Sequence, residues 1–415
     1  MEFLTLDHVD ASGKVVLLRV DMNVPYNSQT GTIGDSERIG AHAETVKELS
    51  DKGARVVILA HQGRKGDPDF THLTQHAGLI SKHIGKPVLY VDDVIGERAI
   101  KSITDLEDGD ILLLDNVRTL RDETIHRSAE EHAESSIVKT LSPLAALFVN
   151  DAFSVAHRSH ASIVGFTARL PSVAGRVMER EVRSCEIALN ASRPRIFILG
   201  GRKPDDCVGV MKHMLERQFL DKALTCGLLG QLLLISNGVD VGEESRDYLR
   251  EKGALGLVSI LKDLQSNYGD NMEYPLDVAE QVDGTRVERN REELPCKGLI
   301  MDIGHKTIER YRELLENAGS IVVKGPAGVY EEREFELGTR TLLEEIKNSR
   351  AYSLICGGHT SAALSSLGFK PDDFSYVSTA GGALITYLSG EDLPGLKALE
   401  ETARRNRQFV NTPRE

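Results

Sequence analysis

Two kinds of loop follow the apolar, strand-like runs of this chain, and each kind suits a different way of holding an anion. In the first half the runs end in charged clusters, which are Arg19–Asn23, His61–Arg64, Asp115–Arg118 and Asn150–Asp151 with His157–Arg158. In the second half they end in glycine turns, which are Gly200–Lys203, Cys226–Gly227, Lys324–Gly328, Gly357–Thr360 and Thr379–Gly382. Arginine forks match the paired oxygens of a carboxylate or phosphate, whereas backbone N–H groups at glycine turns and helix starts cradle phosphates. The loops therefore predict two substrates, a small anion and a phosphate-bearing partner.

The elements that must position these loops alternate between short apolar runs and helical patterns, as in residues 36–52. Such runs are typical of parallel strands covered on both faces, and ligands of open α/β sheets bind at the carboxyl ends of the strands. The predicted strands of the first half are Val15–Val20, Arg55–Ala60, Val88–Val91, Ile111–Leu114 and Ala146–Val149. Those of the second half are Arg195–Leu199, Ala223–Cys226, Leu299–Met301, Ile321–Val323, Leu354–Cys356 and Tyr376–Val377. We predict an α/β fold of two doubly wound parallel-sheet domains joined by a helix.

The pattern breaks between the two halves near residues 165–190. We predict a first domain over residues 1–170, an interdomain helix and hinge over 171–189, and a second domain over 190–399. Within the hinge, Ser172 is the expected cap of a helix over Ala174–Leu189. For the charged tail, residues 400–415, two alternatives stay open: a frayed end, or docking onto the first domain.

Composition narrows the class of protein. The chain has 415 residues, a net charge of −13, 40% hydrophobic residues and five scattered cysteines. The net negative charge argues against non-specific binding of nucleic acid, and no stretch approaches the ~20 apolar residues of a membrane helix. Five cysteines without a Cys-x-x-Cys pair favour reduced thiols. We expect a cytoplasmic protein with no nucleic-acid or membrane partner, monomeric or, alternatively, dimeric.

Several common catalytic motifs are absent from the sequence. There is no P-loop, no Gly-x-Gly-x-x-Gly after the first strand, no His-Glu-x-x-His and no nucleophile elbow. A P-loop kinase, a typical dinucleotide dehydrogenase, a zincin and an α/β-hydrolase all become less plausible. His72, His76 and His83 suggest a metal ladder, but spacing along a helix surface is the favoured interpretation, and no metal ligands are assigned.

Seven words of the sequence occur together and in order. They are Leu18–Pro25, His61–Arg64, Asp115–Arg118, Asn150–Phe153 with Ala156–Ser162, Leu199–Lys203, Lys324–Glu331 and Val377–Ala383. With these words, which span most of the chain, the sequence closely resembles the phosphoglycerate kinase family. The Asp302–Thr307 segment resembles its archaeal members. The resemblance implies reversible phosphoryl transfer between ATP and the carboxylate of 3-phosphoglycerate, giving ADP and 1,3-bisphosphoglycerate, with Mg²⁺ on the nucleotide phosphates and closure of the two domains.

The resemblance also implies which residues form the two sites. The residues implied for phosphoglycerate are Asp21, Met22, Asn23, Arg38, His61, Gln62, Gly63, Arg64, Arg118 and Arg158. Those implied for ATP or ADP are Gly200, Gly201, Lys203, Gly227, Gly325, Pro326, Glu331, Gly357, Gly358, His359 and Thr360. Among these, Glu331 would accept hydrogen bonds from the ribose hydroxyls.

Four residues are implied to act on the phosphoryl group itself. Arg38 and Lys203 would bridge it during transfer, while backbone N–H groups at Gly357 and Gly381 would cap its oxygens. Phosphoryl transfer needs positioning and charge neutralisation more than covalent help. The acceptor is a carboxylate, which is already ionised near neutral pH, so no general base is required.

The chain departs from the family's usual words at three positions. Cys207 stands where a second lysine is usual, and His359 where an aspartate usually helps to hold the metal. Mg²⁺ would then rest on phosphates and water. Lys324 replaces an asparagine, and we expect it to supply part of the missing charge.

Simpler interpretations stand beside these assignments. Taken alone, Arg38 could be a solvated helix residue, His61 a satisfied core histidine, and Gly325–Gly328 only a turn, and Arg19 is more readily structural. Alternative functions are a two-domain binding protein without chemistry, a dinucleotide-dependent dehydrogenase, and a degenerate family member that only binds its ligands.

Overall fold

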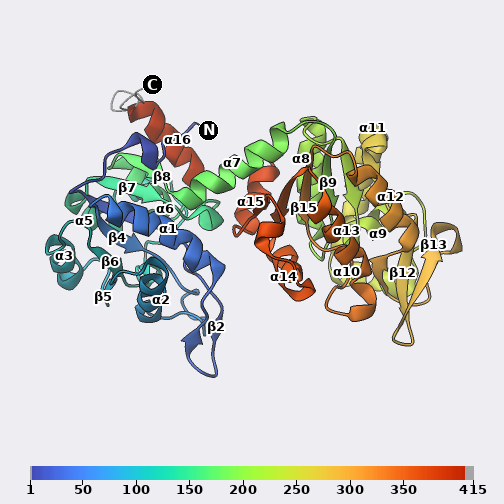
Figure 1. Ribbon diagram of the computed structural model, residues 1–415, viewed down its shortest axis with the longest axis horizontal. Helices are drawn as coiled ribbons and strands as arrows, with labels where there is room; N and C mark the ends of the chain where they lie inside the picture. Colours follow the sequence, from blue (N-terminus) through green and yellow to red (C-terminus); the bar gives the residue numbers. More distant parts are fainter. Residues whose placement is uncertain (1, 407–415) are drawn as a thin grey trace. The chain divides into compact units, whose positions relative to one another are not determined.

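A computed structural model describes residues 2–406 and separates the chain into two compact units (Figure 1). Unit 1 comprises residues 1–183 and 392–415, and unit 2 comprises residues 184–391. Helix α7 (Arg176–Asn190) contains the point at which the units divide. The C-terminal helix α16 (Pro394–Asn406) packs on unit 1 against β8 and α6, and residues 407–415 of the predicted tail lie outside the described residues.

Unit 1 is built on a six-stranded parallel sheet in the order β5-β6-β4-β1-β7-β8. Its strands are β1 (Val15–Arg19), β4 (Arg55–Leu59), β5 (Leu89–Val91), β6 (Ile111–Leu114), β7 (Leu147–Asn150) and β8 (Ser172–Ala174), and β2 (Tyr26–Asn27) with β3 (Thr32–Ile33) forms a small separate ribbon. Its other helices are α1 (Glu37–Asp51), α2 (Thr74–Ile84), α3 (Glu97–Thr104), α4 (Ala129–His132), α5 (Ser136–Leu141) and α6 (Ala161–Val164).

Both faces of this sheet are covered, because alternate residues of each strand enter opposite cores. Val16 and Leu18 of β1 join a core with apolar residues of α1 and α2. Leu17, between them, joins the opposite core with residues of α3 and α5. The continuous apolar runs in the sequence therefore reflect burial on two sides.

Unit 2 repeats the design with a parallel sheet in the order β11-β10-β9-β15-β16-β17. The strands are β9 (Arg195–Leu199), β10 (Lys222–Thr225), β11 (Met272–Glu273), β15 (Ser320–Lys324), β16 (Tyr352–Cys356) and β17 (Tyr376–Val377). The helices are α8 (Pro204–Glu216), α9 (Gly227–Ser236), α10 (Glu243–Glu251), α11 (Leu257–Tyr268), α12 (His305–Leu315), α13 (Leu337–Asn348), α14 (Gly358–Leu367) and α15 (Gly382–Leu388). The predicted α/β class with two doubly wound parallel sheets is confirmed.

One predicted strand belongs elsewhere. The run Leu299–Met301 becomes β14 (Ile300–Ile303), which pairs antiparallel with β12 (Asp277–Val282) and not with the parallel sheet. A hairpin of β12 and β13 (Thr285–Asn290) completes this small three-stranded sheet. An apolar run shows burial but not the partner of a strand, so its place could not be read from the sequence.

The start of helix α7 also differs from the prediction. Ser172 does not cap a helix: residues 172–174 form strand β8, which pairs with β7, and the helix begins at Arg176. Asp151 supplies the cap from a distance, since its Oδ1 accepts hydrogen bonds from the backbone N–H groups of Val177 and Met178 at 2.8 and 3.3 Å. A cap provided by a residue far away in the chain leaves no local signal.

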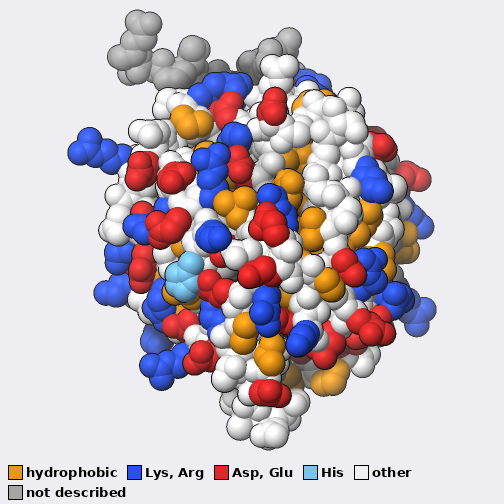
Figure 2. All heavy atoms as spheres, turned by 90° about the vertical axis from the view of Figure 1, so that its right-hand side faces the viewer, with side chains coloured by type: hydrophobic (Ala, Val, Ile, Leu, Met, Phe, Trp, Pro, Cys, Tyr) orange, Lys and Arg blue, Asp and Glu red, His pale blue; other side chains and the backbone are white. Residues whose placement is uncertain are grey.

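The surface and the histidines bear on the expected partners. Figure 2 shows a face of unit 2 on which acidic and basic side chains are interspersed, with apolar side chains between them. No helix among the described residues is long and apolar enough to span a membrane. In the same residues, no group of three or more His, Cys, Asp or Glu side chains is placed to hold a metal ion. Within the suggested histidine ladder, His76 is wholly buried, so the helix-surface interpretation is wrong for it.

The buried His76 predicts a pH dependence of stability. Burial lowers its pKa from 6.5 to about 4, so between these values the unfolded chain binds a proton that the folded chain does not. The stability is present above pH 6.5 and is lost as the pH falls toward 4, by at most about 3 kcal/mol. Urea unfolding at pH 7 and pH 5 should show a smaller loss in His76→Gln. The exposed His305→Gln is the control, and equal losses in both variants would contradict the prediction.

Candidate functional site

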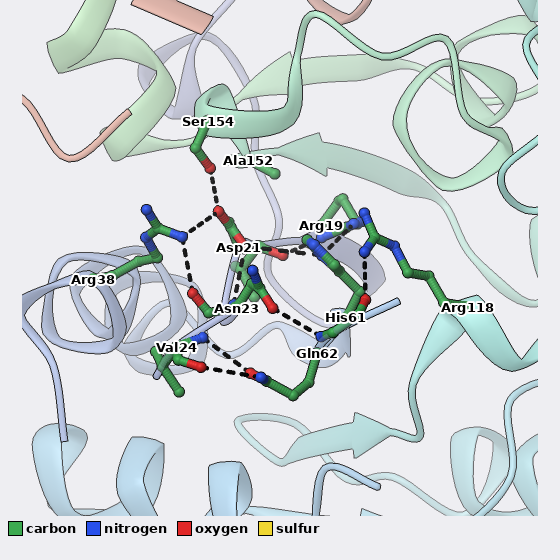
Figure 3. Close-up of polar contacts among 12 residues, drawn as sticks. Arg19, Asp21, Asn23, Val24, Arg38, His61, Gln62, Arg118, Ala152 and Ser154 are labelled. Atoms are coloured by element: carbon green, nitrogen blue, oxygen red, sulfur yellow. Dashed lines mark hydrogen bonds and ion pairs between the residues drawn. The ribbon is translucent and has the colours of Figure 1, made fainter. Parts of the chain in front are cut away.

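In unit 1 a buried carboxylate organises the charged residues that follow β1 and β4 (Figure 3). Asp21 Oδ2 accepts from Arg38 at 3.0 Å and from the Ser154 hydroxyl, and its Oδ1 accepts from the backbone N–H of Asn23 at 3.0 Å. Burial alone would raise the pKa of Asp21, but Arg38, the nearby His61 and these hydrogen bonds outweigh it and lower the pKa. The ionised Asp21 therefore holds Arg38, which also donates to Asn23 O at 2.9 Å.

His61 is held as a neutral hydrogen-bond donor. Its Nδ1 lies 3.1 Å from a guanidinium nitrogen of Arg19. Because a guanidinium can only donate, Nδ1 accepts and Nε2 carries the proton. Burial, together with Arg19, Arg118 and Arg158, lowers the pKa of His61 well below its ordinary value, despite the opposing effect of Asp21. The site thus presents an uncharged N–H beside several cations.

A basic cavity of about 450 Å³ lies in the same unit. Its lining residues are Arg64, Lys65, Arg118, Leu120, Arg121, Thr124 and Arg158. Burial and the neighbouring arginines Arg19 and Arg158 lower the pKa of Arg118 to about 10, so it stays protonated near neutral pH. Cations are brought together here without an equal number of carboxylates, which is the arrangement expected of an empty anion site.

The residues predicted for the anion site do not all contribute side chains in the same way. Arg64, Arg118 and Arg158 line the cavity. Gly63 N donates to Asn23 Oδ1 at 2.8 Å, and Arg118 donates to Gly63 O. Met22 is wholly buried in the apolar core. These bonds join the predicted loops, while Met22 can offer a ligand only its backbone.

Two further residues stabilise the loops without facing the cavity. The Gln62 side chain is fully buried and makes a two-way bond with Val24, accepting from its N–H at 2.9 Å and donating to its C=O at 3.0 Å. Arg19 is also buried and donates to Ser162 Oγ at 2.9 Å, to Val20 O and to His61. Their contacts are internal, which fits the structural interpretation of Arg19.

In unit 2 the glycine turns lock together through the backbone. Gly200 N donates to Lys324 O at 2.8 Å, Gly201 N to Pro326 O at 2.8 Å, and Gly227 N to Ala327 O at 3.1 Å. Gly325 has a φ of +87°, and a Cβ at this position would lie 2.2 Å from Gly200 O. Only glycine permits both this conformation and this approach. The N–H groups of these turns are thus used internally, and the turns shape the site rather than bind phosphate themselves.

A charged cavity of about 410 Å³ lies over these turns. The lining residues among those predicted are Gly200, Gly201, Lys203, Gly325, Gly357, Gly358, His359, Thr360 and Gly381. Helix α14 begins at Gly358, and its first-turn N–H groups have no acceptor within the helix. Lys203 and these helix-start amides give the cavity the character of a phosphate site.

A second, mainly apolar cavity of about 380 Å³ shares Gly201, Arg202 and His359 with the charged one. It also takes in Gly227, Pro326 and Glu331, and its further lining includes Leu228, Tyr248, Pro275, Val278, Leu299, Ile300, Met301, Ile303, Ala327, Val329 and Tyr330. An apolar slot that continues into a cationic, amide-lined cavity matches the shape of a nucleotide, with its base in the first and its phosphates in the second.

Comparisons with known proteins agree with this geometry. The family model described as phosphoglycerate kinase matches residues 6–391. A phosphoglycerate kinase from Methanothermobacter thermautotrophicus is 44% identical over 402 residues, covering 97% of each chain. One from Saccharolobus solfataricus is 41% identical over 397 residues, covering 95% of this chain and 96% of the other. The crystal structure of phosphoglycerate kinase from Pyrococcus horikoshii superposes with a TM-score of 0.87 at 34% identity, covering 97% of this chain and 99% of the other.

The chain belongs to the phosphoglycerate kinase family. It is an enzyme of glycolysis that transfers a phosphoryl group between ATP and 3-phosphoglycerate. The degenerate alternative finds no support in these comparisons.

Sequence reasoning missed parts of both cavities of this family member. Lys65 and Arg121 follow predicted residues closely, and their positive charges within the same loops were the available signal. The apolar lining of the slot in unit 2 had no such signal, because residues such as Val278 and Met301 come from the antiparallel sheet and look like ordinary core residues.

Proposed function

We propose that unit 1 binds 3-phosphoglycerate and that unit 2 binds ATP or ADP. The observation that carries this division is the pairing of two different sites, an arginine-lined cavity beside Asp21 and Arg38 in one unit and an apolar slot continuous with a cationic cavity in the other. The first suits a compact polyanion, and the second suits a nucleoside with its phosphates.

In unit 1, the arginines Arg64, Arg118 and Arg158 would bind the phosphate end of phosphoglycerate. The Nε2–H of His61 and the amide of Asn23 would then donate to its other oxygens. Arg38 would lie at the carboxylate end, held in place by Asp21. Preformed ion pairs of this kind orient a charged group without reorganisation at the moment of reaction.

In unit 2, the nucleobase would occupy the apolar slot, and Glu331 at its wall would accept from the ribose hydroxyls. Lys203 and the N–H groups at the starts of α14 and α15, near Gly357 and Gly381, would bind the phosphates. The acceptor carboxylate attacks in its ionised form, so the residues position and neutralise charge without taking up a proton.

Replacing Arg38 tests the catalytic assignment. Arg38→Ala should lower ATP-dependent phosphorylation of 3-phosphoglycerate by about 10²–10³-fold, the usual cost of losing one transition-state donor. A coupled assay with and without Mg²⁺ measures this. Arg55→Ala is the matched control, since Arg55 is a surface arginine of the same unit paired with Asp108 at 2.8 Å. Equal activity in the two variants would exclude Arg38 from the transfer step.

The charged cavity fits the Mg²⁺ that the family implies. Asp206 is the one carboxylate in its described lining, and Mg²⁺ in nucleotide sites takes one or two carboxylates together with phosphate oxygens. We therefore place the carboxylate contact at Asp206, with His359 unable to take that role as a hard oxygen ligand. The ion would neutralise charge on the phosphates.

Asp206→Asn tests this placement. The variant should need several-fold more Mg²⁺ for half-maximal activity, because one anionic oxygen ligand is lost. Calorimetric titration of ADP should also show a smaller gain in affinity on adding Mg²⁺. The neighbouring and exposed Asp205→Asn, which does not line the cavity, should behave as wild type. An unchanged Mg²⁺ dependence in Asp206→Asn would place the ion on phosphates and water alone.

In-line transfer further requires the two substrates to meet, although their sites belong to different units. We expect both ligands together to favour a closed state that excludes water. Solution scattering should show a smaller radius of gyration only when 3-phosphoglycerate and a non-hydrolysable ATP analogue are both present. An unchanged radius with both ligands at saturation would contradict closure.

The setting of the reaction is a smaller part of the proposal. All five cysteines are free and buried. Unpaired thiols favour a reducing compartment such as the cytoplasm.

A further inference from the structure

Lys324 lies at the centre of the nucleotide unit and has no role in the assignments above. It is the last residue of β15, the strand between β9 and β16 in the sheet. Its backbone C=O accepts from Gly200, and the next residue, Gly325, donates to Thr360 Oγ1 at 2.9 Å. The strand end is thus fixed between two of the turns that form the charged cavity.

The side chain of Lys324 is buried, with 8% of its surface exposed, and it lines the charged cavity together with Lys203. Its Nζ donates to Lys203 O and to Cys207 Sγ, both at 3.2 Å. Burial raises the pKa of the Cys207 thiol, despite the opposing charge of Lys324, so near neutral pH the sulfur is a weak and uncharged acceptor. Neither contact neutralises the ammonium.

The ion pair recorded for Lys324 among residues 2–406 is with Asp206, at 3.4 Å. The Asp206 side chain is 42% exposed, so water competes for it. The buried Arg19 in unit 1 has a different setting, since it lies in the field of the buried carboxylates Glu123 and Asp21. A buried cation whose anionic partner is exposed and outside the core is poorly neutralised until an anion enters the cavity.

We propose that Lys324 is a catalytic residue of the nucleotide site, which leaves Asp206 and binds the phosphate chain of the nucleotide beside Lys203. This inference rests on the proposed nucleotide site in unit 2. The ammonium would keep its contacts with Lys203 O and Cys207 Sγ and direct its third N–H to a phosphate oxygen. Asp206, released from the pair, becomes available to the metal ion. The positive charge expected at position 207 would thus come from the neighbouring strand.

Calorimetry without Mg²⁺, in the presence of EDTA, isolates the lysine contact from the metal. Lys324→Met, which keeps the length and loses the charge, should weaken ADP binding at least about tenfold and leave AMP binding nearly unchanged, because the contact is to the outer phosphates. Lys324→Arg should retain part of the affinity. Lys347→Met breaks another lysine–aspartate pair of the same unit, with Asp373 at 2.9 Å, and should match wild type.

The exchange with Asp206 gives an independent reporter that needs no change at the buried lysine. Asp206→Asn should strengthen Mg²⁺-free ADP binding, because the competing carboxylate is gone. This gain should disappear when Lys324→Met is also present. In steady-state assays, Lys324→Met should lower kcat by about 10²-fold with an unchanged KM for 3-phosphoglycerate.

The outcomes separate this inference from the function on which it rests. If Lys203→Met also leaves ADP binding intact, the proposed nucleotide site itself is wrong. If Lys203→Met weakens binding while Lys324→Met matches wild type, only the role of Lys324 is overturned. Equal losses of ADP and AMP affinity in Lys324→Met would also overturn it, since a disturbed pocket does not distinguish the two. Should that variant fail to fold, weaker or unchanged ADP binding in Asp206→Asn would decide against the exchange.

Discussion

The need to neutralise buried charge governs both substrate sites of this enzyme. A charge inside a protein is costly unless nearby groups compensate it. In unit 1 Asp21 is compensated by Arg38 and by hydrogen bonds, and that compensation fixes the direction in which Arg38 points. The arginines of the basic cavity have no equal set of carboxylates. The same physical rule therefore produces a rigid support and, beside it, an attraction for an anion.

Unit 2 meets the demand through its backbone. The turns at Gly200, Gly227 and Gly325 approach each other so closely that side chains are excluded, and their N–H groups bond to neighbouring turns. The result is a stiff floor, over which the first-turn amides of α14 remain directed at the cavity. Phosphates can then be bound by groups that need no rearrangement, which is how electrostatic stabilisation is most effective.

Division of the reaction between two units follows from these different solutions. An arginine-rich cavity gives strong, directional contacts to a small polyanion, whereas a long nucleotide needs an apolar slot next to a phosphate site. The two requirements conflict within one cavity, because an apolar wall near many cations lowers their hydration without supplying partners. Placing them on separate sheets avoids the conflict.

Much of the enzyme was determined by its sequence alone. The alternation of apolar runs and helical patterns identified both parallel sheets, because burial on two faces leaves a continuous apolar signature. Charged loops and glycine turns at strand ends indicated the two sites, because parallel strands bring their carboxyl ends to one edge.

The tertiary structure decided what depends on contacts between distant residues. Asp151 caps α7 from another strand, β14 joins an antiparallel sheet, and Met22 and Gln62 turn into the interior. Lys324 and Cys207 became neighbours only when β15 and α8 packed together. Such pairings carry no local pattern, since the free energy of each contact depends on a partner that may lie more than a hundred residues away in the chain.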